Sequence, residues 1–173
     1  MPFWTSPERV DPPYVADERA MLETFLDYHR DTLLVKCSGL DGKQLVERSV
    51  SPSGLSLLGI LRHLTEVERY WFRQGWQGDL DDVYCTDEYP DGDFDLTDPE
   101  RADDDLAAYR SEVAAAREEA ARHDLDDTVE KRRAGRPTAV SLRWILIHMI
   151  EEYARHNGHA DLLRERIDGA TGE

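Results

Sequence analysis

The chain has 173 residues, enough for one domain with a substantial hydrophobic core, so we treat residues 1–173 as a single domain. The formal net charge of −16 disfavours nucleic acid and anionic membranes as partners, because both attract cationic proteins. Cys37 and Cys85 are far apart and lack CxxC spacing, which indicates unpaired thiols in a reducing compartment, with a single disulfide as the less favoured alternative. Residues 1–8 lack a signal-peptide pattern and no apolar run reaches the length of a membrane span, so we expect a cytoplasmic protein.

Four long segments carry apolar residues at helical spacing, while strand-favouring runs are scarce. After an extended lead-in over residues 1–16, the first helix is expected over about residues 17–37. A connection at residues 43–53 leads to a second helix over about residues 53–76. Residues 78–99 then form a long acidic loop, and a loop of this length in a compact domain is often functional, as a lid or pocket wall.

The third helix is expected over about residues 98–123, with Asp98 as its N-cap and Pro99 at its first position. A basic linker separates it from the fourth helix, over about residues 138–168, which Gly169 is suited to cap. The sequence therefore predicts an all-α protein, folded as a single four-helix bundle with a long loop between its second and third helices.

The fourth predicted helix carries the clearest chemical signal, a glutamate and a histidine on its apolar face. Glu152 and His156 are four residues apart, so a helix stacks them on one side. At about 100° of rotation per residue, several apolar residues lie within about 80° of Glu152. These residues are Leu142, Ile145, Met149, Ala160 and Leu163. A carboxylate among core residues is unfavourable unless it is paired or bound to a cation, so the pair is a candidate for metal binding.

His63 on the second predicted helix is the third candidate ligand. It lies at the edge of an apolar stripe, about 40° beyond Val67, where an isolated histidine is most simply a core residue. Together with Glu152 and His156 it completes a set of two imidazoles and one carboxylate. Such a set holds zinc with an open coordination position, and it also suits non-haem iron or another first-row divalent metal.

Two segments, residues 52–71 and 148–161, resemble the second and fourth helices of actinobacterial DinB-like proteins. The similarity covers most of the chain and places it with the DinB/YfiT-like superfamily, whose members include thiol-dependent S-transferases. Members of this kind bind a divalent metal through one histidine on the second helix and two residues four apart on the last. The resemblance thus implies His63, Glu152 and His156 as the metal ligands.

The chain departs from the common family pattern at one ligand. Many members have His-x-x-x-His followed by Arg-Gly-Gln, whereas this chain has Glu152 and then His156-Asn157-Gly158-His159. It resembles in this the N-terminal metal-binding domain of mycothiol-dependent maleylpyruvate isomerase, which also uses two histidines and a glutamate. That enzyme has an additional C-terminal domain that helps to build its substrate site, so its substrate is not carried over.

The resemblance implies a thiol-dependent, mycothiol-type S-transferase with two small-molecule partners, a low-molecular-weight thiol and an electrophile. The metal, with zinc as first choice and nickel or iron as alternatives, would lower the pKa of the bound thiol, and the thiolate would attack the electrophile. Glu66, one turn after His63, is a candidate base or support for that ligand, although a solvated carboxylate is more common there. Arg62 and Arg155 are candidates to bind a carboxylate of the cofactor or substrate, with Arg143 as a third.

Three alternatives stay open. His148 and His159 both lie within about 40° of Glu152 and are candidates to replace a ligand or to hold Glu152 from behind. The competing function is a non-catalytic, stress-linked binding protein, or a bundle whose metal site has lapsed. Homodimerisation is undecided, because the third helix has no heptad pattern. Gly158 is expected to permit close approach of a neighbouring helix or ligand.

Overall fold

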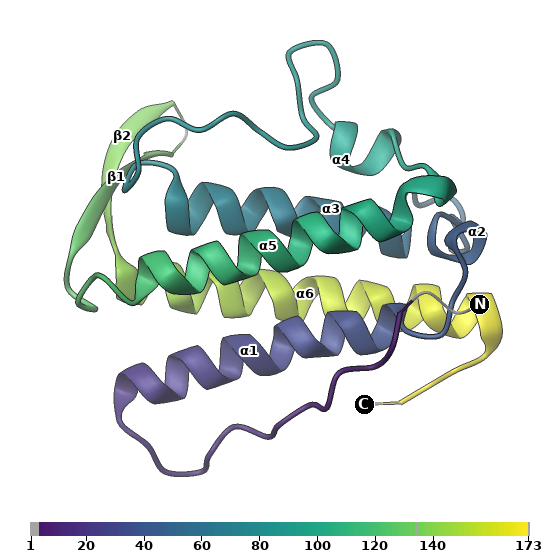
Figure 1. Ribbon diagram of the computed structural model, residues 1–173, viewed down its shortest axis with the longest axis horizontal. Coiled ribbons are helices and arrows are strands. Elements are labelled where there is room, and N and C mark those ends of the chain that lie inside the picture. Colours follow the sequence, from purple (N-terminus) through teal and green to yellow (C-terminus); the bar gives the residue numbers. More distant parts are fainter. Residues whose placement is uncertain (1–3, 134, 173) are drawn as a thin grey trace.

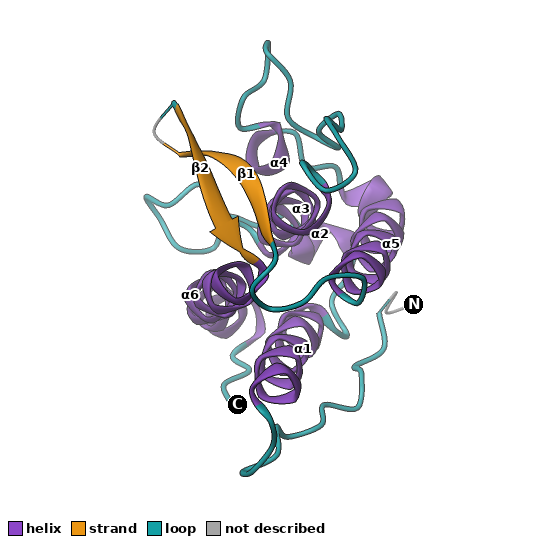
Figure 2. Ribbon diagram, turned by 90° about the vertical axis from the view of Figure 1, so that its left-hand side faces the viewer, coloured by secondary structure: helices purple, strands orange, loops and turns teal. Residues whose placement is uncertain are grey.

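The computed structural model describes residues 4–133 and 135–172. Four long helices run alongside one another in Figure 1: α1 Glu18–Cys37, α3 Leu57–Glu68, α5 Ala102–Ala120 and α6 Leu142–Asp168. Figure 2 looks along the four helices and shows α1 beside α6 and α3 beside α5. Apolar side chains fill the space between them, including Leu26, Leu33, Ile60, Leu61, Leu64, Ile145 and Met149. None of the helices in the described part of the chain is long and apolar enough to cross a membrane.

The predicted bounds of the first helix and the predicted end of the last helix agree with the structure. The side chain of Asp17 accepts a hydrogen bond from the backbone N–H of Ala20 and caps α1. Gly169 ends α6 in the left-handed conformation, with φ of 79°, which favours glycine. An aspartate N-cap at the start of α1 and a glycine C-cap at the end of α6 are thus sufficient to predict these two helix boundaries.

The second predicted helix is shorter than expected. Its N-cap is Ser56, and α3 ends at Glu68, where the chain continues as a π-helix, η1 Arg69–Arg73. The third predicted helix begins with Asp98 capping a single 3₁₀ turn, η2 Pro99–Arg101, before α5 starts. Helical spacing of apolar residues does not distinguish these helix types over a single turn.

The basic segment before α6 is a β-hairpin, which corrects the expected all-α class and the expected start of the fourth helix. Strands β1 Thr128–Arg133 and β2 Arg136–Ser141 pair antiparallel, and Val129 lies opposite Val140. The chain is therefore mostly helical, with a small two-stranded sheet. Only Val129 and Val140 are buried apolar residues of these strands, so the alternating pattern that identifies a strand is nearly absent.

A buried lysine attaches the hairpin to the π-helix. The ammonium group of Lys131 donates hydrogen bonds to the backbone carbonyls of Tyr70, in η1, and of Gln74, the C-cap of η1. Burial lowers the pKa of Lys131 to about 8. The hairpin also packs closely on the segment after η1, because a Cβ added to Gly75 would lie 2.8 Å from Cγ2 of Val129. The hairpin is thereby held over the end of α3.

The connections contain two further one-turn helices, α2 Gly42–Leu45 and α4 Gly92–Asp95. The helix α4 lies within the long acidic loop and packs above α3 (Figure 1). The loop folds back on itself closely at Gly92, where an added Cβ would lie 2.4 Å from the carbonyl oxygen of Tyr84. No larger residue fits there without moving the backbone, so this turn of the loop has a defined shape.

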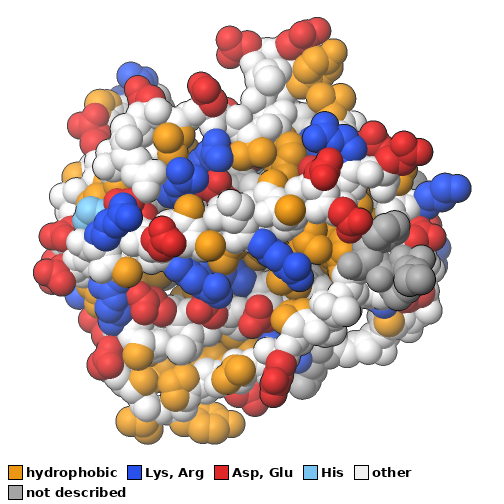
Figure 3. Space-filling model, in the orientation of Figure 1, with side chains coloured by type: hydrophobic (Ala, Val, Ile, Leu, Met, Phe, Trp, Pro, Cys, Tyr) orange, Lys and Arg blue, Asp and Glu red, His pale blue; other side chains and the backbone are white. Residues whose placement is uncertain are grey.

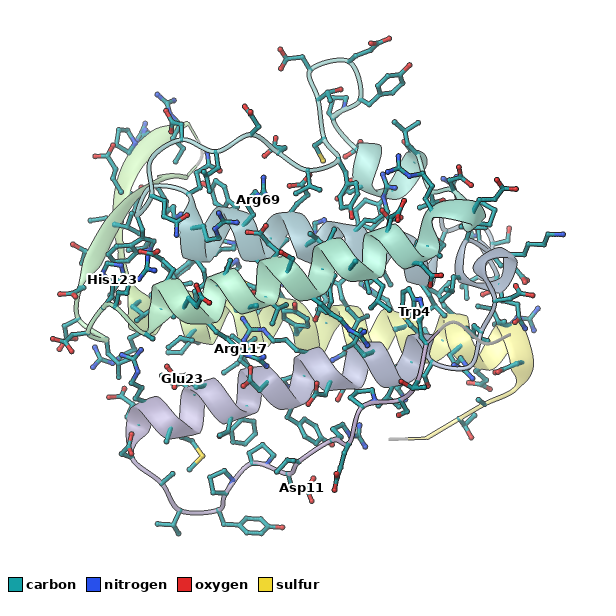
Figure 4. All side chains as sticks on the ribbon, in the orientation of Figure 1. Trp4, Asp11, Glu23, Arg69, Arg117 and His123 are labelled. Carbon is teal, nitrogen blue, oxygen red and sulfur yellow. The ribbon has the colours of Figure 1, made fainter. Side chains whose placement is uncertain are left out.

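Charged residues of both signs cover the outer face of α1 and α5 (Figure 3). Arg117 projects from α5 toward α1 (Figure 4) and its guanidinium lies 2.9 Å from the carboxylate of Asp27. Both side chains are about half exposed, so this ion pair contributes at most about 1 kcal/mol to stability. The buried contacts of the core dominate the stability of the helices.

Candidate metal centre

Helices α3 and α6 bring together the three residues predicted as metal ligands. His63 lies on α3, and Glu152 and His156 lie one turn apart on α6. Each offers one ligand atom, and these atoms all lie within 4.8 Å of one another. His156 is buried, while His63 and Glu152 are partly buried. The cluster thus lies between two packed helices.

A residue of the acidic loop orients His63. The Nδ1 atom of His63 lies 2.9 Å from Oδ2 of Asp93, which is on α4 and nearly fully buried. A carboxylate accepts hydrogen bonds, so Nδ1 carries the hydrogen and Nε2 keeps its lone pair for another partner. Phe94 stacks on the same ring, with ring centroids 4.8 Å apart. The loop therefore fixes both the plane and the tautomer of this imidazole.

The sequence alone does not single out Asp93. It is one of many aspartates in residues 78–99, and nothing in their spacing distinguishes it. Its contact with His63 depends on how the loop folds over α3, which hydrophobic periodicity does not encode.

The carboxylate of Glu152 has three ion-pair neighbours but makes no hydrogen bond in the described part of the chain. Its oxygens lie 3.7 Å from Nε2 of His156, 3.7 Å from Nε2 of His148 and 3.6 Å from a guanidinium nitrogen of Arg155. These separations exceed ordinary hydrogen-bond lengths. A partly buried carboxylate flanked by imidazoles, without a hydrogen bond of its own, is an environment that a cation would stabilise.

The second histidine of the cluster is uncharged at neutral pH. Burial lowers the pKa of His156 to about 4, and the nearby positive charge of Arg155 disfavours the protonated form further. The Nδ1 atom of His156 is buried without a hydrogen-bond partner among the described residues. A neutral imidazole with an available lone pair is the form that binds metals.

This pKa predicts a pH dependence of stability in the metal-free protein. Between about pH 6.5 and 4 the unfolded chain protonates His156 and the folded chain does not, so the free energy of unfolding falls as pH falls. The full difference is about 3 kcal/mol. We expect urea unfolding of the parent to lose more stability between pH 7 and 4 than unfolding of His156→Gln, which cannot titrate. Equal losses in the two proteins would show that His156 is not protected from protonation.

The two alternative histidines lie beside the cluster. His148 stacks on Trp144, with ring centroids 4.8 Å apart, and meets the edge of Trp71. The ring of His159 lies 5.3 Å from that of His156. Neither belongs to the group whose ligand atoms lie within 4.8 Å. His148 instead lies next to the candidate ligand Glu152, with its Nε2 3.7 Å from the carboxylate.

The structure places Arg62 and Glu66 against the acidic loop. Arg62 is buried and donates hydrogen bonds to the backbone carbonyls of Gly92 and Asp93, at 2.9 and 3.1 Å. A carboxylate oxygen of Glu66 accepts from the backbone N–H of Cys85 at 3.1 Å. Neither side chain belongs to the three-residue cluster, although both lie on the same helix as His63.

The other predicted contacts lie on α6. Arg155 is half exposed beside Glu152 and also pairs with Glu151. Arg143 pairs with Glu18 at 2.7 Å, near the start of the helix. The prediction that Gly158 permits close approach of a neighbouring helix is wrong for the described residues, because a Cβ added to Gly158 would meet nothing within 4 Å.

Comparison with known proteins supports the resemblance drawn from the sequence. A family model described as mycothiol-S-transferase matches residues 21–169, which include all three residues of the cluster. This is a DinB-like family, so the predicted DinB/YfiT-like relationship is confirmed. A search of curated proteins found no match.

Proposed function

Because the chain belongs to the mycothiol-S-transferase family, we propose that it joins the sulfur of mycothiol to an electrophilic substrate with the help of a divalent metal ion. The observation that carries the metal-dependent part is the cluster of His63, Glu152 and His156 between α3 and α6. We further propose that the four long helices form a DinB-type four-helix bundle around this site.

The residues of the cluster fit a divalent cation. Two imidazoles and one carboxylate form a three-ligand set, which leaves a coordination position open. Glu152 lacks a hydrogen bond among the described residues, and Asp93 supports His63 as carboxylates commonly support metal-binding imidazoles. We propose zinc, with nickel or iron as alternatives. When bound, the cation would supply a positive charge that lowers the pKa of a thiol at the open position.

The protein's own residues would prepare this site before any substrate arrives. Asp93 holds the tautomer of His63, and burial keeps His156 neutral. The negative charge of Glu152 would offset part of the charge of the cation. Of the two arginines predicted to contact a cofactor, Arg155 is exposed next to Glu152, whereas the donors of Arg62 face the loop. We therefore propose Arg155 as the contact for an anionic group of the thiol or the electrophile.

A thiol-transfer assay tests this function. Zinc-loaded protein should accelerate the loss of free mycothiol in the presence of an electrophile such as an activated aryl halide. A chelator should abolish the acceleration, and added zinc should restore it. If the protein holds zinc but accelerates no reaction of mycothiol, glutathione or cysteine with any electrophile of a broad panel, the proposal fails and a non-catalytic binding protein is favoured.

A further inference from the structure

One buried arginine on α3 anchors the short helix of the acidic loop. The guanidinium of Arg62 donates from Nη2 to the carbonyl of Gly92, from Nε to the carbonyl of Asp93 and from Nη1 to the carboxylate of Asp105. Its Cζ also lies 4.0 Å from the centroid of the Tyr84 ring. A single side chain thus holds the first two residues of α4 and the loop before it.

The helix α4 depends on such anchors. It has only four residues, and its N-cap Asp91 makes no capping hydrogen bond. A single helical turn is not stable by itself, because helix nucleation is unfavourable. Glu66 provides a second anchor, since its carboxylate accepts from the backbone N–H groups of Tyr84 and Cys85. The position of α4 is therefore determined from α3.

The helix α4, held by Arg62, places the carboxylate of Asp93 next to His63, the residue that follows Arg62. Asp93, whose carbonyl accepts from Arg62, presents its side chain to Nδ1 of His63 at 2.9 Å. Two consecutive residues of α3 thus hold the main chain and the side chain of the same aspartate. A displacement of the Asp93 backbone would remove the acceptor from His63.

We propose that Arg62 is a positioning residue that acts through Asp93 to keep His63 protonated on Nδ1, with Nε2 available as a ligand atom. This role differs from the cofactor contact predicted from the sequence. Only its affinity readout rests on the proposed metal-dependent function, because the tautomer of His63 is a property of the metal-free protein.

The role requires arginine. The planar fork of donors reaches two carbonyls and a carboxylate simultaneously, whereas lysine presents one nitrogen at the end of a flexible chain. Arg62→Lys keeps the positive charge and loses this geometry. Arg48→Lys is the matched control, since Arg48 contacts the carbonyl of Phe94 and the carboxylate of Asp95 at the other end of α4.

A double-mutant cycle of zinc affinity tests the coupling. Asp93→Asn should weaken zinc binding by about 10- to 100-fold, as expected for loss of a carboxylate behind a metal-binding histidine. Arg62→Lys should weaken it by about tenfold and Arg48→Lys by less than about twofold. The double variant Arg62→Lys/Asp93→Asn should bind about as weakly as Asp93→Asn, because both act on one contact. Parental affinity in Arg62→Lys, or multiplicative losses in the double variant, would overturn the proposal.

The nitrogen resonances of His63 in the metal-free protein give a second readout, which a failure to bind zinc would not affect. In the parent the Nδ1–H tautomer should dominate, and in Arg62→Lys both tautomers should appear while Arg48→Lys keeps the parental spectrum. If Arg62→Lys does not fold by circular dichroism, Arg62→Gln, which also loses the fork of donors to Gly92 and Asp93, takes its place and should mix the tautomers in the same way. An unchanged Nδ1–H tautomer in the folded variant would contradict the proposed role.

Discussion

Glu68→Leu is expected to lower the free energy of unfolding by about 3–5 kcal/mol, because it leaves the buried guanidinium of Arg30 with the partly exposed carboxylate of Asp27 as its remaining charge partner among the described residues. The carboxylate of Glu68 is fully buried and accepts two hydrogen bonds from Arg30, each 2.7 Å long. It also accepts one from the hydroxyl of Tyr153 at 2.8 Å. Removing the carboxylate leaves the guanidinium of Arg30 with its contact to Asp27 and the hydroxyl of Tyr153 with its contact to Tyr109. Part of the desolvation of both groups is then no longer offset.

Urea unfolding of the metal-free protein measures this loss. The double variant Arg30→Met/Glu68→Leu should be more stable than Glu68→Leu alone, because it also removes the buried positive charge of Arg30. Asp95→Ala is the control, since its ion pair with Arg48 is largely exposed and should contribute less than about 1 kcal/mol. A loss below about 1 kcal/mol in Glu68→Leu would mean that Asp27 or water compensates the charge of Arg30 without Glu68.

Glu152→Ala and His156→Ala should each reduce the rate of thiol transfer by about a thousandfold or more. Loss of a metal ion that stabilises charge raises the free energy of the transition state by several kcal/mol, and each 1.4 kcal/mol lowers the rate about tenfold. The measurement is kcat/KM for mycothiol with one fixed electrophile, at saturating zinc. Circular dichroism should show both variants folded, because among the described residues Glu152 makes no hydrogen bond and Nδ1 of His156 has no hydrogen-bond partner.

His123→Ala is the matched histidine control. His123 lies just after α5 near the hairpin (Figure 4). The centroid of its ring is 3.8 Å from that of Trp76, and its Nε2 atom is 2.9 Å from a carboxylate oxygen of Glu119. It should keep the parental rate within about twofold. If Glu152→Ala and His156→Ala also keep parental rates, the reaction does not depend on the proposed ligands.

Hydrophobic periodicity predicts most of what positions the site. The apolar stripe of α6 gives Glu152 and His156 a common side, and the stripe of α3 places His63 at an edge that faces α6. Helix spacing constrains such positions strongly, because one residue of shift rotates a side chain by about 100°. The three ligand candidates can therefore be grouped from the sequence alone.

The hairpin cannot be predicted in the same way. The strand β1 ends in four consecutive charged residues, 130–133, rather than an alternating pattern, and Pro137 in β2 is a residue that also favours the start of a helix. Their stability comes from contacts distant in sequence, such as Lys131 with the carbonyls of η1. Tertiary contacts of this kind override local propensity and leave no periodic signal.

Asp93 illustrates why the surroundings of a site are harder to predict than its ligands. Its role depends on the fold of the loop, the anchor at Arg62 and the close turn at Gly92. The loop and its turn at Gly92 have no fixed spacing from His63, which lies 30 residues before Asp93 in the chain. Arg62 and Glu66 are chemical candidates in the sequence because they flank His63, yet their partners are visible only in three dimensions.

Metal content, measured by mass spectrometry on protein purified without an affinity tag or chelator, tests the central claim most directly. The parent should carry close to one divalent metal ion per chain, and His63→Ala prepared in parallel should carry almost none. His123→Ala should match the parent. Equal metal content in the parent and His63→Ala would contradict the site, as would a parent protein that takes up no zinc, nickel or iron when these are added.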